Sequence, residues 1–503
     1  MRRLLGSVTM VGLVLGGCAA EACADDEQKT LSLGQAVERA LAGNADLRRE
    51  RVAVATSAAK QTVAAGQFDV LMGAGLGIQH QITAECPPSC PSQSADTTTT
   101  SSVTVGLSRR LETGGTLKLE GLFSRTNYPA QAATGGSEGS SADSFYNSNL
   151  ALTFTHPLLR GFGTEVTLAN VRKARIQHDM AQLNRQMRAC NVVRDVVVTY
   201  WELAYATQDL AIKRTAVDLA QEQLRTTQAL INAGRLADSD AASVERAIAQ
   251  RLEDLASAEQ NLYFRSLDLL RLFGVPSTAN LPLLAAADAP SSTPPSVEPA
   301  GELARALEAN PQLRALSLGH VLSQTDLATA RNTLRPRLDF TGGAGPVGLK
   351  HGPGGTIGDV AKFGSIAWSA GLVFELPIEN RVALGQMREA QEELNLSSIN
   401  AEDFAAQVRD LVLRTSRSIV TAARRVELGR REVVFAGQNL DAERARFHVG
   451  RATNNDVLLR QQELKDAETR LLRSTVDQNE AEVALSAVTA DILDRFSLVL
   501  KGL

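Results

Sequence analysis

The chain has 503 residues, a net charge of −4 and a sequence pI near 6.0. Because no basic tract stands out, it lacks the electrostatic footprint of nucleic-acid binding. Apolar residues make up 44% of the chain, but no internal apolar run approaches the roughly 20 residues of a membrane helix. Entry into a membrane would therefore have to use strands.

The N-terminus has the form of a secretory signal, in which two arginines precede an apolar stretch at residues 4–15. Two cleavage sites compete. The sequence Leu15-Gly-Gly-Cys18 resembles a bacterial lipobox, which would remove residues 1–17 and leave Cys18 lipidated. The sequence Ala22-Cys-Ala24 instead suits ordinary signal peptidase, which would remove residues 1–24. Both alternatives predict export.

Export also bears on the other cysteines. Cys86 and Cys90 flank Pro-Pro-Ser in a polar stretch, where an oxidising compartment would allow a local disulfide. Half of a metal site is the alternative, with His80 as the nearest further ligand. Since no other ligand candidate converges there, we expect the disulfide and no metal or other cofactor. Cys190 lies in a helical stretch and is expected to pack as a small apolar residue.

A helical pattern from Leu31 to about residue 65 recurs from about residue 301 to Leu334. Both copies carry Ala-Leu-x-x-Asn-x-x-Leu, at Ala40–Leu47 and Ala306–Leu313. The sequence that follows each copy is typical of strands.

The predicted strands, at about 68–157 and 338–376, alternate apolar with small or polar residues. This is the pattern of strands between lipid and a wet lumen, although a half-buried antiparallel sheet gives the same alternation. Long polar loops at 83–100 and 128–146 contrast with a tight turn at 112–115, and that asymmetry favours an outer-membrane barrel. The clearest alternating positions are Ala74, Leu76, Ile78, Val103, Val105, Leu107, Leu117, Leu119, Leu150, Leu152, Phe154, Trp368, Leu372 and Phe374.

The strand sections are predicted to end at Pro157 and Pro377, where a ring without an N–H stops the ladder. A Gly-rich loop at 350–363 is expected to join the strands of the second half. Residues 101–127 look like an added hairpin in the first half. The sequence leaves open whether this hairpin joins the wall of the predicted barrel, folds into its lumen or lies outside it.

Two long helices, about 164–231 and 380–447, contain stretches that match at a constant shift of 216 residues. Each would be roughly 100 Å long at 1.5 Å per residue. Both carry a heptad of small apolar residues, which requires helices that coil around close neighbours. The heptad positions are Val192, Val196, Thr199, Leu203, Ala206, Leu210, Val217, Ala220, Leu224 and Ile231, and Val408, Val412, Thr415, Ile419, Ala422, Val426, Val433, Ala436, Leu440 and Phe447.

The duplication continues into the turns and covers most of the chain. Shorter helices at about 236–273 and 454–490 follow the long ones and complete two helical hairpins. We expect a first repeat at 25–289 and a second at 301–503. The Pro-rich segment 290–300 reads as an extended linker between them.

Duplication, inserted strands and the Gly-x(5)-Asp turns together resemble the TolC-like outer-membrane efflux protein family. Four motifs carry the likeness: Phe447-His-Val-Gly450-Arg-Ala-Thr-Asn-Asn-Asp456-Val-Leu458, Gly234-Arg-Leu-Ala-Asp-Ser-Asp240, His156-Pro-Leu158 and Leu376-Pro-Ile378. The resemblance implies an α+β membrane protein that forms a homotrimer in the outer membrane. Its strands would share one β-barrel in lipid, and its antiparallel coiled-coil helices would form an α-barrel in the periplasm.

The resemblance also implies a function and a set of sites. The protein would be the exit channel that joins a periplasmic adaptor and an inner-membrane transporter, exporting small molecules or proteins. The turns would contact the adaptor through Gly234, Arg235, Gly450 and Arg451. The periplasmic entrance would be formed by Asp240, Asp456, Leu459 and Phe447, with Leu459 where some relatives carry a second acid. The alternative is that Asp240 and Asp456 serve only as helix N-terminal residues, which the helix dipole favours.

Competing functions have less support. A periplasmic adaptor, or another coiled-coil envelope protein, is the alternative, but an adaptor would show one helical hairpin rather than two. An enzyme is not expected, because the six histidines are scattered and no nucleophile or metal-ligand spacing occurs. If the 101–127 hairpin joins the wall, a trimer would have about eighteen strands rather than twelve. The sequence does not name the cargo.

Overall fold

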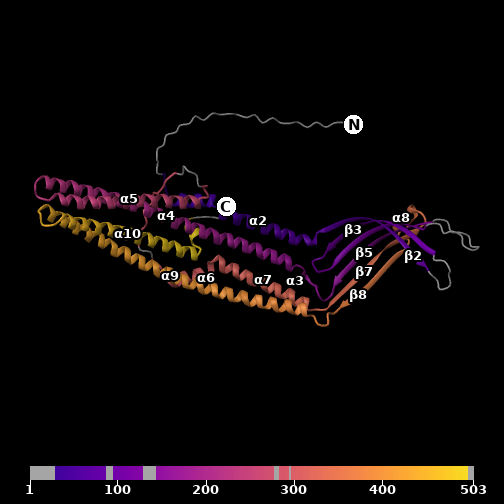
Figure 1. Cartoon of the computed structure of the whole chain (residues 1–503). Coiled ribbons are helices and arrows are strands. Elements are labelled where there is room, and N and C mark those ends of the chain that lie inside the picture. The colour runs from indigo at the N-terminus through magenta and orange to yellow at the C-terminus, as the bar shows by residue number, and fades with distance from the viewer. Residues whose placement is uncertain (1–28, 86–93, 129–142, 277–281, 294–295, 497–503) are drawn as a thin grey trace, which may run out of the picture.

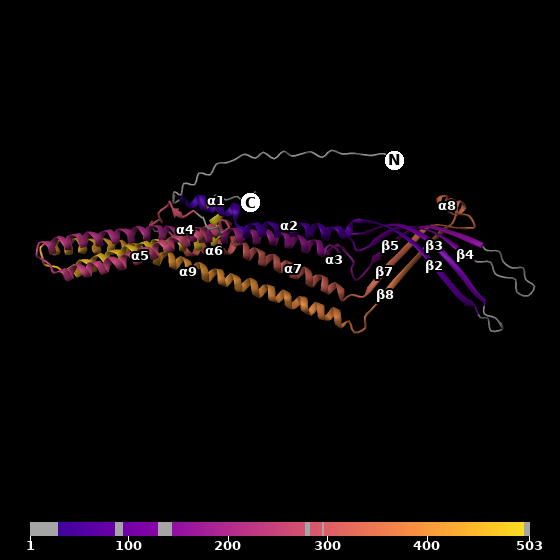
Figure 2. The same ribbon diagram turned by 45° about the horizontal axis from the view of Figure 1, so that its top comes forward.

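The computed structural model describes residues 29–85, 94–128, 143–276, 282–293 and 296–496. The proposed lipidation at Cys18 and the proposed disulfide between Cys86 and Cys90 lie outside these residues and stay predictions. Long helices run side by side through most of the molecule, and a sheet extends from one end of them (Figures 1 and 2).

The described chain is α+β, with long helices and one antiparallel sheet. Its helices are α1 (Leu33–Gly43), α2 (Ala45–Ala65), α3 (Thr164–Thr167), α4 (Ala169–Asn232), α5 (Asp238–Leu272), α6 (Pro299–Ala309), α7 (Pro311–Thr333), α8 (Pro353–Ala361), α9 (Arg381–His448), α10 (Asn454–Val488) and α11 (Ile492–Arg495). Its strands are β1 (Lys29–Leu31), β2 (Val70–Glu85), β3 (Ser94–Arg110), β4 (Thr116–Tyr128), β5 (Asp143–Pro157), β6 (Leu284–Ala286), β7 (Arg337–Lys350) and β8 (Ile366–Glu375).

Helices α4 and α9 are the two long rods, and shorter helices lie against them end to end. Helices α2 and α5 contact successive parts of α4, while α7 and α10 contact successive parts of α9 (Figure 1). Most heptad residues of both rods are buried, and Val196, Leu203 and Val412 are completely covered. The small-residue seam predicted from the sequence is therefore where the helices pack.

Both short N-terminal helical stretches are broken in two, contrary to the single helices expected at 31–65 and 301–334. Asn44 and Asn310 cause the break, because each side-chain oxygen accepts two backbone N–H bonds that start the next helix. The amide nitrogens of Asn44 and Asn310 donate to the carbonyls of Leu272 and Val488. The repeated asparagine is thus a cap that also ties each short helix to the end of a hairpin.

The segment expected as a loop at 350–363 is partly helical, and that expectation was wrong. Helix α8 sits on β5 and β7, with Thr356 fully buried. The Ser148 hydroxyl donates to the Thr356 carbonyl at 3.0 Å. The glycines suggested a loop, but Gly348 lets the helix approach, since a Cβ there would lie 2.5 Å from that carbonyl oxygen.

The largest core lies part-way along the helices, where α1, α4, α5 and α10 meet the small parallel sheet β1–β6. This region is called the waist. Tyr200 is completely buried there, and its hydroxyl, which has one proton to donate, lies 2.9 Å from both the Leu31 carbonyl oxygen and Oδ2 of Asp288. Cys190 is buried in the same core, as predicted, and burial raises the pKa of its thiol to about 11.

A cluster of charges links α4 and α10 beside this core. The Arg473 guanidinium pairs with Glu202 and Asp477, each at 2.6 Å, and with Glu480 at 3.2 Å. Burial raises the pKa of Glu480 to about 7, and the neighbouring Glu202 carboxylate adds to the shift. Oε1 of Glu480 is buried without a hydrogen-bond partner, so a proton shared with Glu202 would satisfy it.

We predict that this cluster makes stability depend on pH. An unfolded Glu480 loses its proton near pH 4.5 and the folded one near 7, so the folded state binds more protons between these values. The melting temperature should therefore fall between pH 5 and 7.5, and Glu480→Gln should reduce that fall by about 2 °C or more, measured by circular dichroism in detergent. The exposed Glu245→Gln is the control. Equal pH dependence in wild type and Glu480→Gln would contradict the prediction.

Candidate channel entrance and pore wall

The end of the molecule farthest from the sheet carries two tight turns, one in each helical hairpin (Figure 1). In the first, α4 ends and Gly234 adopts a φ of 69°. The Arg235 N–H then donates to the Leu230 carbonyl at 2.9 Å, which satisfies one of the free carbonyls at the helix end.

The second turn repeats this geometry. Gly450 has a φ of 73°, and the Arg451 N–H donates to the Arg446 carbonyl at 2.8 Å. A Cβ built on Gly450 would lie 3.9 Å from the Arg235 guanidinium, so the two turns are neighbours. All four turn residues named from the sequence are exposed at this tip.

Asp456 begins α10 by a capping box with Thr453. Its Oδ2 accepts from the Thr453 N–H at 2.8 Å and from the Thr453 hydroxyl at 2.7 Å, while its own N–H donates to that hydroxyl at 3.3 Å. These bonds from Thr453 lower the pKa of Asp456. Asp240 makes only half of the box, accepting from the Ala237 N–H at 3.1 Å, because alanine has no side-chain oxygen to return.

Phe447 is buried at the same tip, in a cluster that joins both hairpins. It packs with Leu440 and Val457 of the second hairpin, and Leu230 and Leu236 of the first lie against the same cluster. Leu459, one turn after Asp456, is half exposed instead. The structure thus brings Phe447 and the two turns together, and it leaves the Leu459 side chain at the surface.

Sequence reasoning missed Asn454, which ties the second hairpin to α4. This residue is 5% exposed, and its side-chain oxygen accepts from the Gln223 amide at 2.8 Å and from the Thr227 hydroxyl at 2.9 Å. The equivalent position in the first repeat, 216 residues earlier, holds Asp238. This difference between the repeats was the one sequence signal that could have pointed to Asn454.

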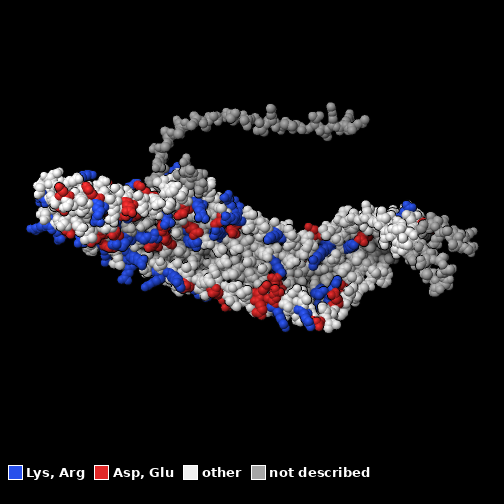
Figure 3. Space-filling model, in the orientation of Figure 1, with Lys and Arg blue, Asp and Glu red and all other residues white. Residues whose placement is uncertain are grey.

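The sheet at the other end has strand order β2-β3-β4-β5-β7-β8, all antiparallel. Its registers place alternate residues of each strand on opposite faces. One face is mainly apolar, and the other is mainly small or polar. Charged side chains gather over the helices in Figure 3, whereas the sheet carries few on this side of the molecule.

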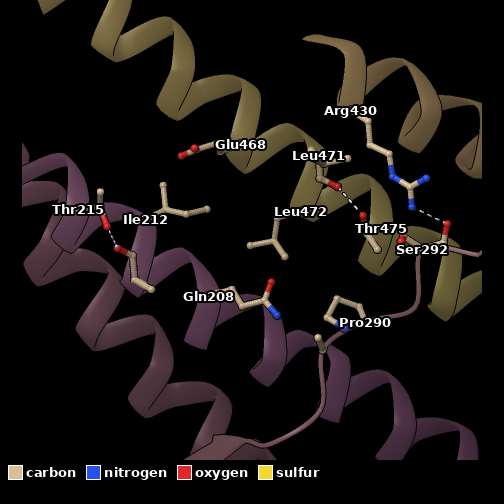
Figure 4. Close-up of a pocket in the computed structure, with 12 residues that line it drawn as sticks. Gln208, Ile212, Thr215, Pro290, Ser292, Arg430, Glu468, Leu471, Leu472 and Thr475 are labelled. Carbon is tan, nitrogen blue, oxygen red and sulfur yellow. Dashed lines mark hydrogen bonds between the residues drawn. The ribbon is translucent and has the colours of Figure 1, made fainter. Parts of the chain in front are cut away.

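A cavity of about 520 Å³ opens at the waist, where residues 289–292 pass over α4, α9 and α10. Figure 4 shows Arg430 reaching to the Ser292 carbonyl, to which it donates at 2.9 Å, while Gln208 and Ile212 of α4 line the cavity on the other side. The cavity is far from both the turns and the sheet.

None of the described helices combines enough length with enough apolar character to cross a bilayer. Among the same residues, no group of three or more His, Cys, Asp and Glu side chains is placed to hold a metal ion.

Comparisons with known proteins identify the architecture. The sequence model described as outer membrane efflux protein matches residues 121–275 and 303–491, well over half of the chain. The chain belongs to this family of outer-membrane efflux proteins. It is thus an outer-membrane efflux channel with its helices in the periplasm, as the resemblance in the sequence predicted.

Solved structures share the fold at low identity. The outer-membrane channel OprN matches at a TM-score of 0.66 with 16% identity, over 91% of this chain and 89% of its own. The channel protein CusC matches at 0.65 with 13% identity, over 91% of both chains. VceC from Vibrio cholerae matches at 0.64 with 14% identity, over 91% of this chain and 96% of its own. A search of curated proteins finds no significant match.

The turn geometry of this efflux protein gives a prediction for Gly450. Gly450→Val places a β-branched residue at positive φ, which strains the turn by about 1–2 kcal/mol. Gly437→Val is the matched control, because Gly437 lies inside α9, where a Cβ would meet no atom within 4 Å and φ is not positive. Cross-linking of the tip to a periplasmic adaptor should fall several-fold in Gly450→Val only. Equal cross-linking in the two variants would count against a role for the turn.

Proposed function

We propose that three copies of this efflux protein form one continuous export tunnel. The observation that carries the proposal is the open sheet: within the described chain, β2 and β8 each have one edge without a strand partner. A bilayer leaves no water for unpaired backbone groups, so such edges must pair with another chain. Six strands of one copy do not enclose a pore of tunnel width, whereas the strands of three copies would.

The surface of α9 supports the same assembly. A row of seven apolar side chains on this helix is more than half exposed, and within the row Leu413, Val420, Leu428 and Phe435 recur every seven or eight residues. The row consists of Leu396, Ile399, Leu413, Val420, Leu428, Val434 and Phe435. Helices of a second copy would cover this row, as the seam inside the chain already covers the opposite side.

At the tip, we propose that the turns bind the adaptor and that the adjoining residues narrow the entrance. Gly234, Arg235, Gly450 and Arg451 are the exposed turn residues available to an adaptor. Asp240, Asp456, Leu459 and Phe447 would form the entrance. The capping role of Asp456 is compatible with this, because only its Oδ2 accepts the cap bonds.

Two repeats, 25–289 and 301–503, would each contribute one helical hairpin and one group of strands to this assembly, joined by the 290–300 linker. An inner-membrane transporter would load the tunnel through the adaptor. Family membership favours this channel over the alternative of a periplasmic adaptor and over an enzyme. Cargo choice would then reside in the transporter rather than in the small and polar wall.

The assembly is tested by native mass spectrometry of the protein extracted in detergent from outer membranes. We expect three chains in one complex, because both sheet edges and the α9 row would be covered only then. A monomer that stays soluble after detergent removal would contradict the proposal.

A second test concerns charge at the entrance. Three copies of Asp456 around one narrow mouth would repel each other and attract cations, so the channel should favour cations. Asp456→Asn should lower that preference and relieve block by trivalent cations in planar-bilayer recordings. Glu245→Gln, which removes one charge from an exposed position on α5, serves as the control. Unchanged selectivity and block in Asp456→Asn would leave Asp456 as a helix cap only.

A further inference from the structure

The hairpin β3–β4 lies inside the sheet rather than beside it. Strand β2 pairs with β3 over its whole length, from Val70 opposite Arg109 to Glu85 opposite Ser94. Strand β4 pairs with β5 from Thr116 opposite Thr155 to Tyr128 opposite Asp143. The hairpin therefore separates β2 from β5, and all six strands of the described sheet are hydrogen-bonded to their neighbours in one continuous order.

The two faces of the sheet stay consistent across this hairpin. Leu76 of β2, Val103 of β3, Phe123 of β4 and Ser148 of β5 are successive register partners on one face. The apolar residues of that face are Met72, Leu76, Ile78, Val103, Val105, Leu107, Leu117, Leu119, Leu150, Leu152, Phe154, Phe340, Ile366, Trp368, Leu372 and Phe374, and the face also carries Ser101, Arg109 and Arg125.

The opposite face is mainly small and polar, although Leu71, Leu122, Phe145, Val347, Leu349 and Val373 also lie on it, and on β2 it combines three glycines with Gln79 and Gln81. It carries Gly73, Gly75, Gly77, Ser102, Thr104, Gly106, Ser108, Lys118, Glu120, Ser124, Asn149, Thr153, Thr341, Gly343, Ser369 and Gly371. A hairpin folded into the lumen would have water on both sides, and its apolar residues would have no reason to match those of its neighbours.

Resting on the proposed trimer, we propose that β3 and β4 are part of the pore wall. Strand β8 of each copy pairs with β2 of the next, and the three sheets close one barrel of eighteen strands. The apolar face meets lipid and the glycine-rich polar face lines the water. The occupant of both free edges is a second copy of this chain, because only a strand supplies the repeated backbone partners that an edge in lipid requires.

Eighteen strands set the width of the exit. With strands about 4.8 Å apart and tilted by about 40°, such a barrel has a backbone radius of about 18 Å, against about 12 Å for twelve strands. Four helices per copy surround the tunnel at each level, and twelve helices about 10 Å apart give a radius of about 19 Å. The exit is thus as wide as the helical tunnel, and it passes bulky solutes on the order of 20 Å across.

Paired cysteine variants test the wall directly. Thr104→Cys and Val105→Cys are neighbours on β3 that place a thiol on opposite faces, and Thr153→Cys and Leu152→Cys do the same on β5. All are made in a cysteine-free background, checked for trimers by native mass spectrometry, and recorded in planar bilayers. A charged, water-soluble methanethiosulfonate should lower the conductance of Thr104→Cys in up to three steps, while Val105→Cys should react only with a lipid-soluble maleimide.

The β5 pair separates the two proposals. If Thr153→Cys and Leu152→Cys behave as lumen and lipid positions but both β3 variants react with the water-soluble reagent, or neither does, the hairpin lies outside the wall and this inference fails. If the β5 pair shows no such difference, the shared barrel itself fails.

The width has an independent test in the unmodified protein. Poly(ethylene glycol) of about 10 Å hydrodynamic radius, added on the side of the long loops, should enter and lower the conductance. Exclusion of this polymer would overturn the proposed width even if the cysteine variants did not assemble.

Discussion

Backbone hydrogen bonding at the edges of the sheet constrains this protein more than any other interaction. Strands β2 and β8 each leave one row of N–H and carbonyl groups unpaired within the described chain. In a bilayer each such group left unpaired costs several kcal/mol, and every strand edge carries a whole row of them. One copy is therefore an incomplete structure. In the helical part, the exposed apolar row on α9 likewise lacks a packing partner within the described chain.

The helical part depends on close packing of small residues along two duplicated rods. Ala206 and Ala220 of α4, and Ala422 of α9, are buried in seams where larger side chains would force the helices apart. Between the two hairpins, buried polar contacts add to the apolar clusters that both hairpins share. Asn454 bonds to α4, and Arg251 of α5 donates both to the Ala216 carbonyl at 2.8 Å and to Gln461 of α10 at 2.9 Å. Such directional contacts fix the register of one hairpin on the other, which apolar packing alone specifies weakly.

The long helices and the two-faced strands were predictable from the sequence because they follow a regular period. Local breaks in that period were not predictable. The heptads and the strand alternation each follow one physical period, so α4, α9 and the two faces of the sheet could be predicted. The break at Asn44 could not, because a cap inside an amphipathic pattern leaves the period intact. Helix α8 was missed because its stability comes from packing on Gly348 and Ser148 rather than from its own glycine-rich sequence. At the tip, the turns were predictable from glycine, but the partners of Asn454 depend on tertiary packing.

The central claim is that every strand of the sheet belongs to the wall of a pore shared by three copies. Electron cryomicroscopy of the full chain in lipid nanodiscs tests it most directly. The account predicts a closed ring at the level of the membrane in which β8 of one copy is hydrogen-bonded to β2 of the next, with β3 and β4 between β2 and β5 in each copy. A ring of twelve strands, with β3 and β4 outside it or inside the lumen, would contradict the account.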